Sequence, residues 1–274
     1  MQTVAEACTA VRADLERSNS PEDLAYFNLH ERRFSATASR VIDLVPSGAE
    51  ILDVGGHYLH LSSVLALLGF RVSAVDVPAH STLSFVKERA ARMGISLYVA
   101  GGDSIAEGQF LGADVDRFEA VLFCEILEHI TFNPIAFWRR IHGLLRPGGM
   151  ILLTTPNSLK LLSVLGAVWN LVSFRRLGLS VKQIMRHATF GQHWKEYSAR
   201  EIGEYFAYLS PDFRVRVRKV SYGPPADDVR RAIGPLRTAI LKFGNATVFF
   251  ATDLEAVITL PAKTQWTLRE PQAG

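Results

Sequence analysis

The stretch from residue 50 to residue 77 restricts what this chain can fold into more than any other. A short apolar run leads to Gly55 and Gly56, which lack a Cβ and so let the backbone turn sharply and a ligand approach the main chain. Apolar residues then recur at helical spacing over residues 59–68. A second apolar run ends at Asp76, where a carboxylate can accept from both hydroxyls of a ribose. This order predicts a βαβ unit that binds a nucleoside cofactor, and a βαβ unit without a ligand is the alternative.

The turn itself argues against a dinucleotide. Nicotinamide and flavin cofactors need glycines spaced as GxGxxG, which leave backbone amides open to a pyrophosphate. Here His57, Tyr58 and Leu59 put bulky side chains where a diphosphate would lie. The stretch instead resembles motif I of the class I S-adenosylmethionine-dependent methyltransferases. Asp53 and Gly55 match that motif, while His57 and Leu59 take the places of its second and third glycines.

Strands and helices continue to alternate after Asp76. The pattern predicts a helix over residues 84–93 and strands over 95–100, 118–124 and 150–155. The segments FEAVLFCEILEHI and LRPGGMILLTTPN resemble the fourth and fifth strands of the same family. The resemblance therefore implies an α/β, Rossmann-like class I methyltransferase fold, with a seven-stranded, mostly parallel sheet, helices on both faces and a helical lid insertion.

Both ends of the chain add elements to this core. Residues 3–18 predict an amphipathic helix, and Ser20 followed by proline predicts the cap of a second one, with a further helix running to residue 45. A capping box starts at Ser198, and the alternating strand 213–220 needs an antiparallel partner, either 247–251 or 254–260. The expected organisation is N-terminal helices over the cofactor and substrate mouth (1–47), the methyltransferase domain (48–261) with its lid insertion (158–192), and a tail (262–274).

The resemblance implies S-adenosylmethionine as the cofactor. Asp53 and the glycines would meet its methionine end and Asp76 its ribose. After the third strand the family has an acid that accepts from the adenine amino group, beside an apolar residue, and Asp103 and Ile105 stand there. A surface turn is the alternative for that segment. The expected cofactor-binding residues are Asp53, Gly55, Gly56, Asp76, Asp103, Ser104, Ile105 and Glu125.

Two carboxylates and an imidazole follow the fourth strand. Glu125, Glu128 and His129 lie within five residues, where open α/β sheets form their ligand crevice. They suit a general base or a divalent cation, Mg or Mn. The pattern ExxEH resembles the metal-assisted small-RNA 2′-O-methyltransferases and the ubiquinone-pathway O-methyltransferases. In the RNA branch a later histidine completes the site, and here His193, or more weakly His187, is its counterpart.

The expected catalytic residues are therefore His129 and His193, and the expected metal ligands are Glu125, Glu128, His129 and His193. The alternative is a metal-free site, because many small-molecule methyltransferases share Leu-Glu-His at this point. Substrate is expected to meet Tyr26, in an aromatic and basic cluster of the N-terminal helices, and Trp194 and Tyr197, which precede a capped helix. Helices that only pack on the sheet edge are the alternative for the N-terminal cluster.

The insertion after the fifth strand is rich in large apolar residues. Its apolar part contains Asn170 and Ser173 and is too short to span a bilayer. It is expected to form a lid, with peripheral membrane contact through residues 158–185 as one hypothesis and packing on the protein itself as the other. The residues that suit an interfacial helix are Trp169, Phe174, Arg175, Arg176 and Lys182.

Composition limits the partners. The 274 residues carry a net charge of +3, from 30 basic and 27 acidic residues, which disfavours nucleic acid as a partner. Cys8 and Cys124 are too far apart to suggest disulfides, and the start of the chain has no apolar signal segment, so a cytoplasmic protein is expected. The hypothesis is a methyltransferase acting on an oxygen of a small or lipid-linked acceptor, with a nitrogen as the less favoured acceptor atom. An RNA methyltransferase, a non-catalytic binding protein and a nicotinamide reductase are the alternatives.

Overall fold

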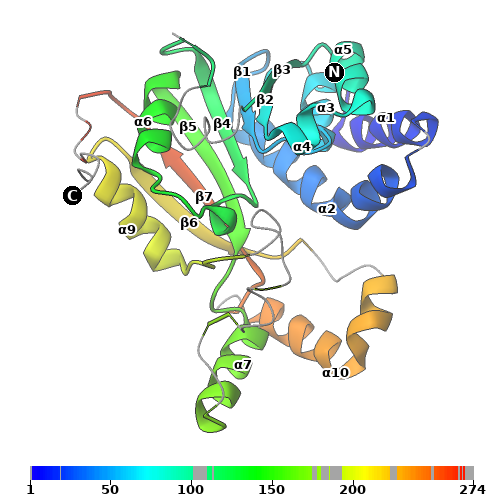
Figure 1. Ribbon diagram of the computed structural model, residues 1–274, viewed down its shortest axis with the longest axis vertical. Coiled ribbons are helices and arrows are strands. Elements are labelled where there is room, and N and C mark those ends of the chain that lie inside the picture. Colours follow the sequence, from blue (N-terminus) through cyan, green and yellow to red (C-terminus); the bar gives the residue numbers. More distant parts are fainter. Residues whose placement is uncertain are drawn as a thin grey trace.

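One mixed sheet forms the centre of the molecule. The computed structural model describes residues 2–18, 20–100, 110–112, 114–174, 178–179, 185, 193–222, 227–247, 250–264, 266 and 268. Within these residues, seven strands form a sheet in the order β3-β2-β1-β4-β5-β7-β6 (Figure 1). The strands are β1 Glu50–Val54, β2 Arg71–Asp76, β3 Ser96–Val99, β4 Phe118–Cys124, β5 Leu145–Pro156, β6 Arg214–Val220 and β7 Asp253–Thr259. The first five are parallel and β7 is antiparallel to β5 and β6, which confirms the predicted fold class.

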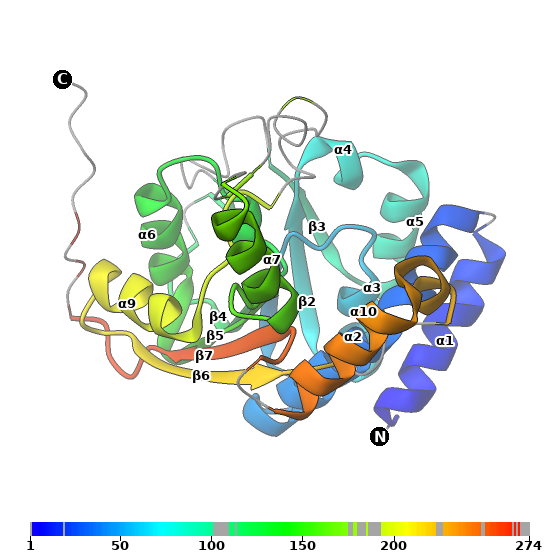
Figure 2. The ribbon, with the colours of Figure 1, turned by 90° about the horizontal axis from the view of Figure 1, so that it is seen from below.

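Helices cover both faces of the sheet, as Figure 2 shows from below. They are α1 Val4–Arg17, α2 Pro21–Leu44, α3 His60–Leu67, α4 Pro78–Ser81, α5 Ser84–Met93, α6 Ile135–Leu144, α7 Leu161–Val172, α9 Ala199–Leu209 and α10 Asp227–Ala246. One apolar core joins the sheet to α1, α2, α3 and α5, and a second joins it to α6 and α9. In the second core, the Trp138 indole N–H of α6 donates to the Tyr205 hydroxyl of α9 at 2.7 Å. The central strands are therefore buried on both faces, which explains their continuous apolar runs.

The element boundaries follow local chemistry. Ser20 caps α2 by accepting from the Asp23 amide, and Pro21 is the first helical residue, as predicted. Ser198 and Glu201 form the predicted capping box of α9.

One expectation at the ends of elements needed correction, and one open choice was decided. The residues from Pro21 onward form one continuous helix, not a short helix and then a second. Pro134 is the N-cap of α6, and the Asn133 side chain accepts from the Ile135 amide. The last strand is the second of the two candidates, because β7 pairs with both β5 and β6.

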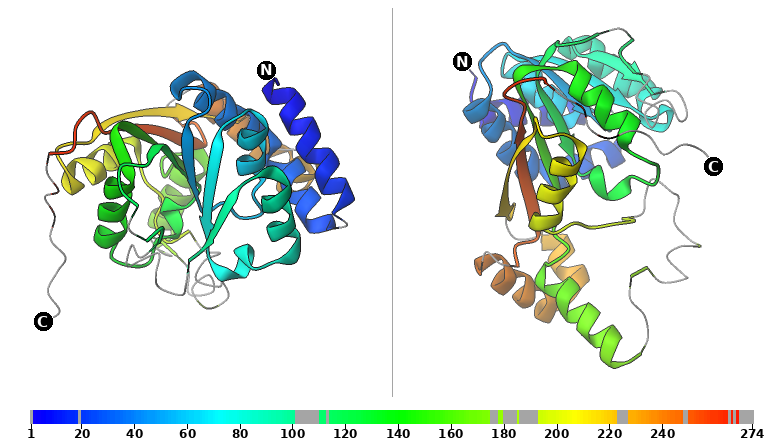
Figure 3. Two further views of the ribbon diagram at one scale, coloured as in Figure 1. Left: turned by 90° about the horizontal axis from the view of Figure 1, so that it is seen from above. Right: turned by 90° about the vertical axis from the view of Figure 1, so that its left-hand side faces the viewer.

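Two helices extend from the sheet beyond the carboxyl end of β5. Figure 1 and the right view of Figure 3 show α7 and α10 side by side, pointing away from the body of the molecule. Gly244 of α10 lies at their contact, since a Cβ added there would be 3.2 Å from the Leu161 Cβ of α7. The backbone of α10 is interrupted at Gly234, just before Pro235. Among the described residues no helix is long and apolar enough to cross a membrane.

Candidate active site

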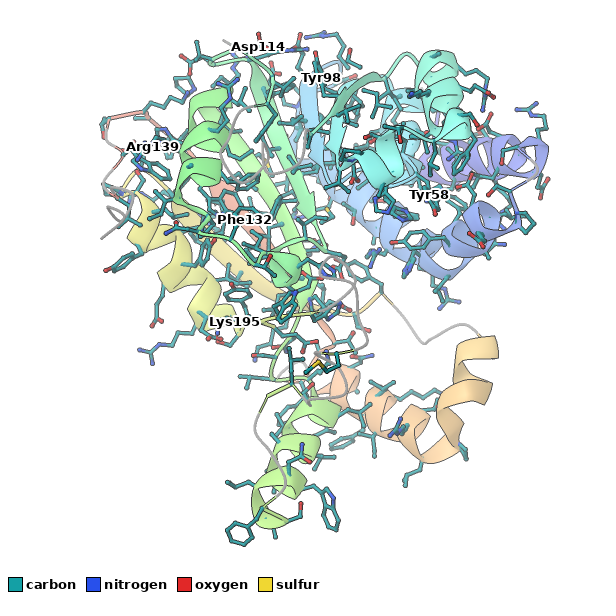
Figure 4. The ribbon with its side chains drawn as sticks, viewed as in Figure 1. Tyr58, Tyr98, Asp114, Phe132, Arg139 and Lys195 are labelled. Atoms are coloured by element: carbon teal, nitrogen blue, oxygen red, sulfur yellow. The ribbon has the colours of Figure 1, made fainter. Side chains whose placement is uncertain are left out.

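A cavity of about 530 Å³ opens at the carboxyl ends of β1, β2 and β4, the end at which parallel α/β sheets bind ligands. The loops after these strands form its floor, and α2 closes one side. Figure 4 shows Tyr58 in the loop after β1, beside α2, and Phe132, which lines the cavity, in the loop after β4. The residues that line it come from five places: from α2 Tyr26, Arg33, Phe34 and Thr37; from the end of β1, the loop after it and α3 Asp53, Gly55, Gly56, His57, His60 and Leu61; from the end of β2, the turn after it and α4 Asp76, Val77 and His80; from the end of β4 and the loop after it Phe123, Cys124, Glu125, Ile126, His129, Ile130, Thr131 and Phe132; and from α6 Phe137.

The loop after β1 keeps a glycine-type backbone without all the glycines. Gly55 has φ +78° and packs so closely on Ile126 that an added Cβ would overlap that side chain. His57 and Leu59 also have left-handed φ values, 48° and 63°. These are the positions at which the sequence lacks the expected glycines. The backbone conformation is therefore retained although the side chains are large.

Aromatic contacts hold His57 in this conformation. Its ring centroid lies 3.8 Å from that of Tyr58, 4.4 Å from that of His80 and 4.5 Å from that of Tyr26. Burial lowers the pKa of His57 to about 3, so the imidazole is neutral. Its Nδ1 is buried and has no hydrogen-bond partner among the described residues, which leaves one polar atom for a ligand.

Two buried acids flank this loop. Asp76 Oδ2 accepts from the His57 amide at 2.6 Å, and Oδ1 accepts from the Val77 amide at 2.6 Å. These bonds fix the carboxylate at the cavity wall, where its remaining lone pairs can accept from hydroxyls. Asp53 Oδ2 accepts from the Ser62 hydroxyl at 2.5 Å. Burial raises the pKa of Asp53 to about 6.

The chain turns sharply after β4. Glu125 has φ 57°, and its amide donates to the Thr154 carbonyl at 2.8 Å. Its Oε1 accepts from the Thr154 hydroxyl at 2.8 Å, and Oε2 lies 3.4 Å from Arg33 Nη1. Arg33 belongs to α2, so this ion pair links the helix to the sheet across the cavity wall.

A short 3₁₀ helix, Leu127–His129, follows that turn. Glu128 is buried, and its Oε2 accepts from the Thr155 hydroxyl at 2.8 Å. Its Oε1 has no hydrogen-bond partner among the described residues and lies 3.9 Å from His129 Nε2. Burial, with the nearby Glu125 charge, raises the pKa of Glu128 to about 7.

His193 comes to the same place from a distant segment. The Trp194 amide donates to the Glu128 carbonyl at 2.8 Å, which fixes the segment against the end of β4. The His193 ring lies 4.9 Å from the His129 ring, nearly perpendicular to it. Its Nδ1 is 3.2 Å from Glu196 Oε1, and this hydrogen bond raises the pKa of His193. The predicted pair of histidines is thus brought together.

Comparison with known proteins decides the family. A family model described as a methyltransferase domain matches residues 29–208. The chain belongs to this methyltransferase family. The matched residues run from within α2 to within α9 and include the strand ends that form the cavity.

Curated relatives of this methyltransferase are ubiquinone biosynthesis O-methyltransferases. The one from Methylocella silvestris is 30% identical over 162 residues, which are 58% of this chain and 57% of that protein. The one from Xanthomonas axonopodis pv. citri is 34% identical over 116 residues, 42% of this chain and 46% of that protein. The chain thus spans about half the length of the curated relatives it matches.

Solved structures share the fold of this methyltransferase. An S-adenosylmethionine-dependent methyltransferase from Archaeoglobus fulgidus has a TM-score of 0.52 at 14% identity, over 86% of this chain and 99% of that one. The phosphoethanolamine N-methyltransferase 2 of Haemonchus contortus, solved with S-adenosyl-L-methionine, has a TM-score of 0.54 at 14% identity, over 83% and 53%. Family and relatives together support the predicted enzyme class, an S-adenosylmethionine-dependent methyltransferase.

The structure brings some of the expected site residues of the methyltransferase together and separates others. Glu128, His129 and His193 each offer one ligand atom within 4.8 Å of the others. Glu125, the fourth expected metal ligand, is not in that group of described residues and instead faces Thr154 and Arg33. The residues singled out from the sequence that lie outside the described residues are Asp103, Ser104, Ile105, Arg175, Arg176, Lys182 and His187.

The three expected substrate residues of the methyltransferase differ in position. Tyr26 lines the cavity. Trp194 and Tyr197 are not among the described residues that line it, and Tyr197 packs against Tyr205 of α9. Sequence reasoning missed Glu196, although its place three residues after His193 was a signal for a side-chain pair.

Proposed function

We propose that this methyltransferase transfers the methyl group of S-adenosylmethionine to a hydroxyl oxygen of a small or lipid-linked acceptor. The observation that carries this proposal is the group Glu128, His129 and His193 beside the cavity, because two imidazoles and a buried carboxylate can accept a hydroxyl proton. The O-methyltransferase names of the relatives support an oxygen acceptor.

The cavity fits the methyl donor on two observations. The glycine-type backbone of the β1 loop is retained, and the buried His57 Nδ1 has no partner among the described residues. In this proposal Asp76 holds the ribose hydroxyls, as its position at the end of β2 suits. The methionine end would meet Asp53, Gly55, Gly56 and Glu125, with Arg33 available for the carboxylate. Asp103, Ser104 and Ile105 remain the proposed adenine residues.

The chemistry needs alignment and removal of one proton. The bound sulfonium supplies an activated methyl carbon. The acceptor oxygen would bond to that carbon as the carbon–sulfur bond breaks, with the bonding electron pair left on the sulfur. The acceptor proton passes to His129, which lines the cavity, or to His193 beside it. Glu196, held by Lys160 Nζ at 2.7 and 2.8 Å, fixes the His193 tautomer with its proton on Nδ1.

Titration and turnover test this proposal together. We expect S-adenosylhomocysteine to bind the wild type, and Asp76→Ala to weaken binding about 100-fold, because ribose hydrogen bonds to a buried carboxylate are lost. His129→Ala should keep the affinity within about 3-fold but lower kcat on catechols and on short-chain prenylated hydroquinones about 100-fold. Methylation of amines with no turnover of any hydroxyl would contradict the oxygen acceptor. Full activity of His129→Ala would remove its catalytic role.

One observation favours a metal-assisted form of the same reaction. Glu128, His129 and His193 supply one oxygen and two nitrogen ligands at metal-binding separation. Such an ion, Mg²⁺ or Mn²⁺, would supply Lewis-acid stabilisation of the acceptor oxygen. Calorimetric titration of MnCl₂ and MgCl₂ into wild type and His193→Ala tests this. Heat that the variant lacks supports the ion, and no heat in the wild type removes it. Turnover of an RNA 3′ end in place of small hydroxyls would instead support the RNA alternative.

A further inference from the structure

The surface of α7 is unusual for a globular protein. The helix LLSVLGAVWNLV contains no charged residue, and none of the residues Leu161–Val172 is buried. Large apolar side chains at its far end are exposed, Trp169 by 63%, Val172 by 68% and Phe174, just beyond the helix, by 96%. Figure 4 shows α7 carrying its side chains at the tip of the part that extends from the body. A continuous exposed apolar surface of this kind marks an interaction site.

A second segment, distant in sequence, enlarges this surface. The α10 helix packs against α7 where Gly244 meets Leu161. It adds Leu236, exposed by 74%, and Phe243, exposed by 64%. The apolar surface is therefore built by two helices that are about 70 residues apart in the chain, beyond the insertion that the sequence pointed to.

In residues 234–246 of α10, the charged side chains beside this surface are all basic. Arg237 and Lys242 of α10 are exposed next to Leu236 and Phe243. No acidic residue occurs in α7 or in residues 234–246. Apolar and aromatic side chains bordered by cations are typical of helices that lie in the interface of an anionic bilayer.

The length of α7 decides how such a surface can meet a bilayer. Twelve residues of helix reach about 18 Å, well short of the hydrocarbon thickness of about 30 Å. The helix can therefore lie in the interface but cannot span it. The position also fits, because α7 follows the carboxyl end of β5, at the edge of the sheet where the cavity opens.

We propose that α7 and α10 together form an interfacial surface that binds the enzyme peripherally to anionic lipid bilayers. The apolar side chains Leu165, Trp169 and Phe174 of the first segment and Leu236 and Phe243 of the second enter the headgroup and acyl boundary. Arg237 and Lys242 contact lipid phosphates. The proposal extends the proposed function, because a lipid-linked acceptor would be met at that surface, but the binding itself does not depend on methyl transfer.

Vesicle co-sedimentation of the full chain tests it. We expect binding to vesicles of phosphatidylglycerol and phosphatidylcholine in equal parts, and at least 10-fold weaker binding to pure phosphatidylcholine. The double variant Trp169→Glu/Phe174→Glu should bind the mixed vesicles at least 10-fold less. Arg237→Gln/Lys242→Gln should lose the preference for anionic lipid. The matched control is Tyr208→Glu, since Tyr208 is an aromatic residue of α9 that is exposed by 74%.

The outcomes separate this surface from the active site and from other occupants. Every variant should bind S-adenosylhomocysteine with wild-type affinity, so failure of the proposed function would be seen in that titration and not in sedimentation. The proposal is overturned if the wild type does not bind mixed vesicles, or if the double variant and Tyr208→Glu bind them equally. A wild-type dimer in light scattering that the double variant converts to monomer, without vesicle binding, would assign the surface to a second copy of the chain.

Discussion

At the scale of single residues, the site stores backbone strain where the strands end. His57, Leu59 and Glu125 are not glycines and yet have φ values of 48°, 63° and 57°. Each left-handed residue costs on the order of 1 kcal/mol, which the surrounding contacts must offset. Such strain is concentrated at functional sites because it positions amides and carboxylates in a fixed geometry. The loop is therefore shaped by its packing and not by the intrinsic preference of its residues.

His57 provides the test of this conclusion. Because the backbone there is already left-handed, His57→Gly keeps the loop conformation and should weaken S-adenosylhomocysteine affinity by no more than about 5-fold, the cost of losing the imidazole Nδ1 contact. His57→Val should weaken it about 10-fold or more and lower the free energy of unfolding by about 2 kcal/mol, since a β-branched residue does not tolerate positive φ. Calorimetry and urea unfolding measure the two effects. Equal affinities and equal free energies of unfolding for the glycine and valine variants would show that the left-handed backbone at residue 57 is not required for ligand binding or stability.

Asp53 gives a prediction about pH. Its folded-state pKa is raised to about 6 by burial, above its ordinary value of 3.8. A raised pKa contributes stability that is fully present below the unfolded-state value and is lost as the pH rises through about 6. Asp53→Asn keeps an acceptor for Ser62 but cannot ionise.

We therefore expect the variant to gain stability relative to the ligand-free wild type between pH 4 and pH 7, by at most about 3 kcal/mol. Urea unfolding at several pH values measures the difference. Parallel stability curves for the two proteins would contradict a raised pKa at Asp53.

Some residues of the site could be placed from the sequence, and some of its ion pairs could not. Asp76 could be placed from the sequence, because strand ends in a βαβ unit meet at one edge of the sheet. The pairs Arg33 with Glu125 and Glu196 with Lys160 could not, since each joins segments whose relative position depends on the packed fold. A sequence motif consists of residues that are close in the chain, whereas the residues of these two ion pairs are close only in the folded structure.

At the scale of elements, a buried polar network fixes the N-terminal helices to the domain. Arg89 of α5 is fully buried and donates to Asp23 of α2 at 2.5 Å and to the Tyr58 carbonyl at 2.6 Å. Asp23 Oδ1 lies 2.7 Å from His60 Nε2 of α3. The network therefore connects α2 to α3, to α5 and, through the Tyr58 carbonyl, to the loop after β1, which positions Tyr26 and Arg33 at the cavity.

Removing Arg89 should be strongly destabilising. Arg89→Met leaves the Asp23 carboxylate buried without its cation, and we expect the free energy of unfolding to fall by about 3–5 kcal/mol. Arg92→Met is the matched control, because Arg92 is a half-exposed arginine of the same helix that pairs with Asp14. It should cost about 1 kcal/mol or less. Urea unfolding measures both, and equal losses would mean that the buried network is not what holds α2 in place.

Element boundaries were predictable where local chemistry decides them. The start of α2 at Ser20 and Pro21 and the capping box of α9 depend on side chains within three residues. The choice between two last strands was not predictable, because it depends on which segment completes pairs with both β5 and β6. The contact of α7 with α10 could not be predicted for the same reason, because it joins two segments that are distant in the sequence.

At the scale of the whole molecule, the cavity lies where several parts of the fold meet. Its walls come from α2, the β1 loop and the ends of β2 and β4. A ligand that contacts all of them should stabilise the folded state by about 2.7 kcal/mol at 100 times its Kd. For a chain of this size that corresponds to a rise in Tm of about 5–10 °C.

Scanning calorimetry with S-adenosylhomocysteine measures this rise, which should depend on ligand concentration. Asp76→Ala should show almost none of it, because the carboxylate that the ribose requires is absent. Tyr208→Glu should show the full shift, since that residue lies on the exposed face of α9, outside the cavity lining. An equal shift in wild type and Asp76→Ala would mean that the ligand binds elsewhere. A rise in Tm in the wild type and in Tyr208→Glu, but not in Asp76→Ala, would show that the ligand stabilises the fold through the carboxylate at the end of β2.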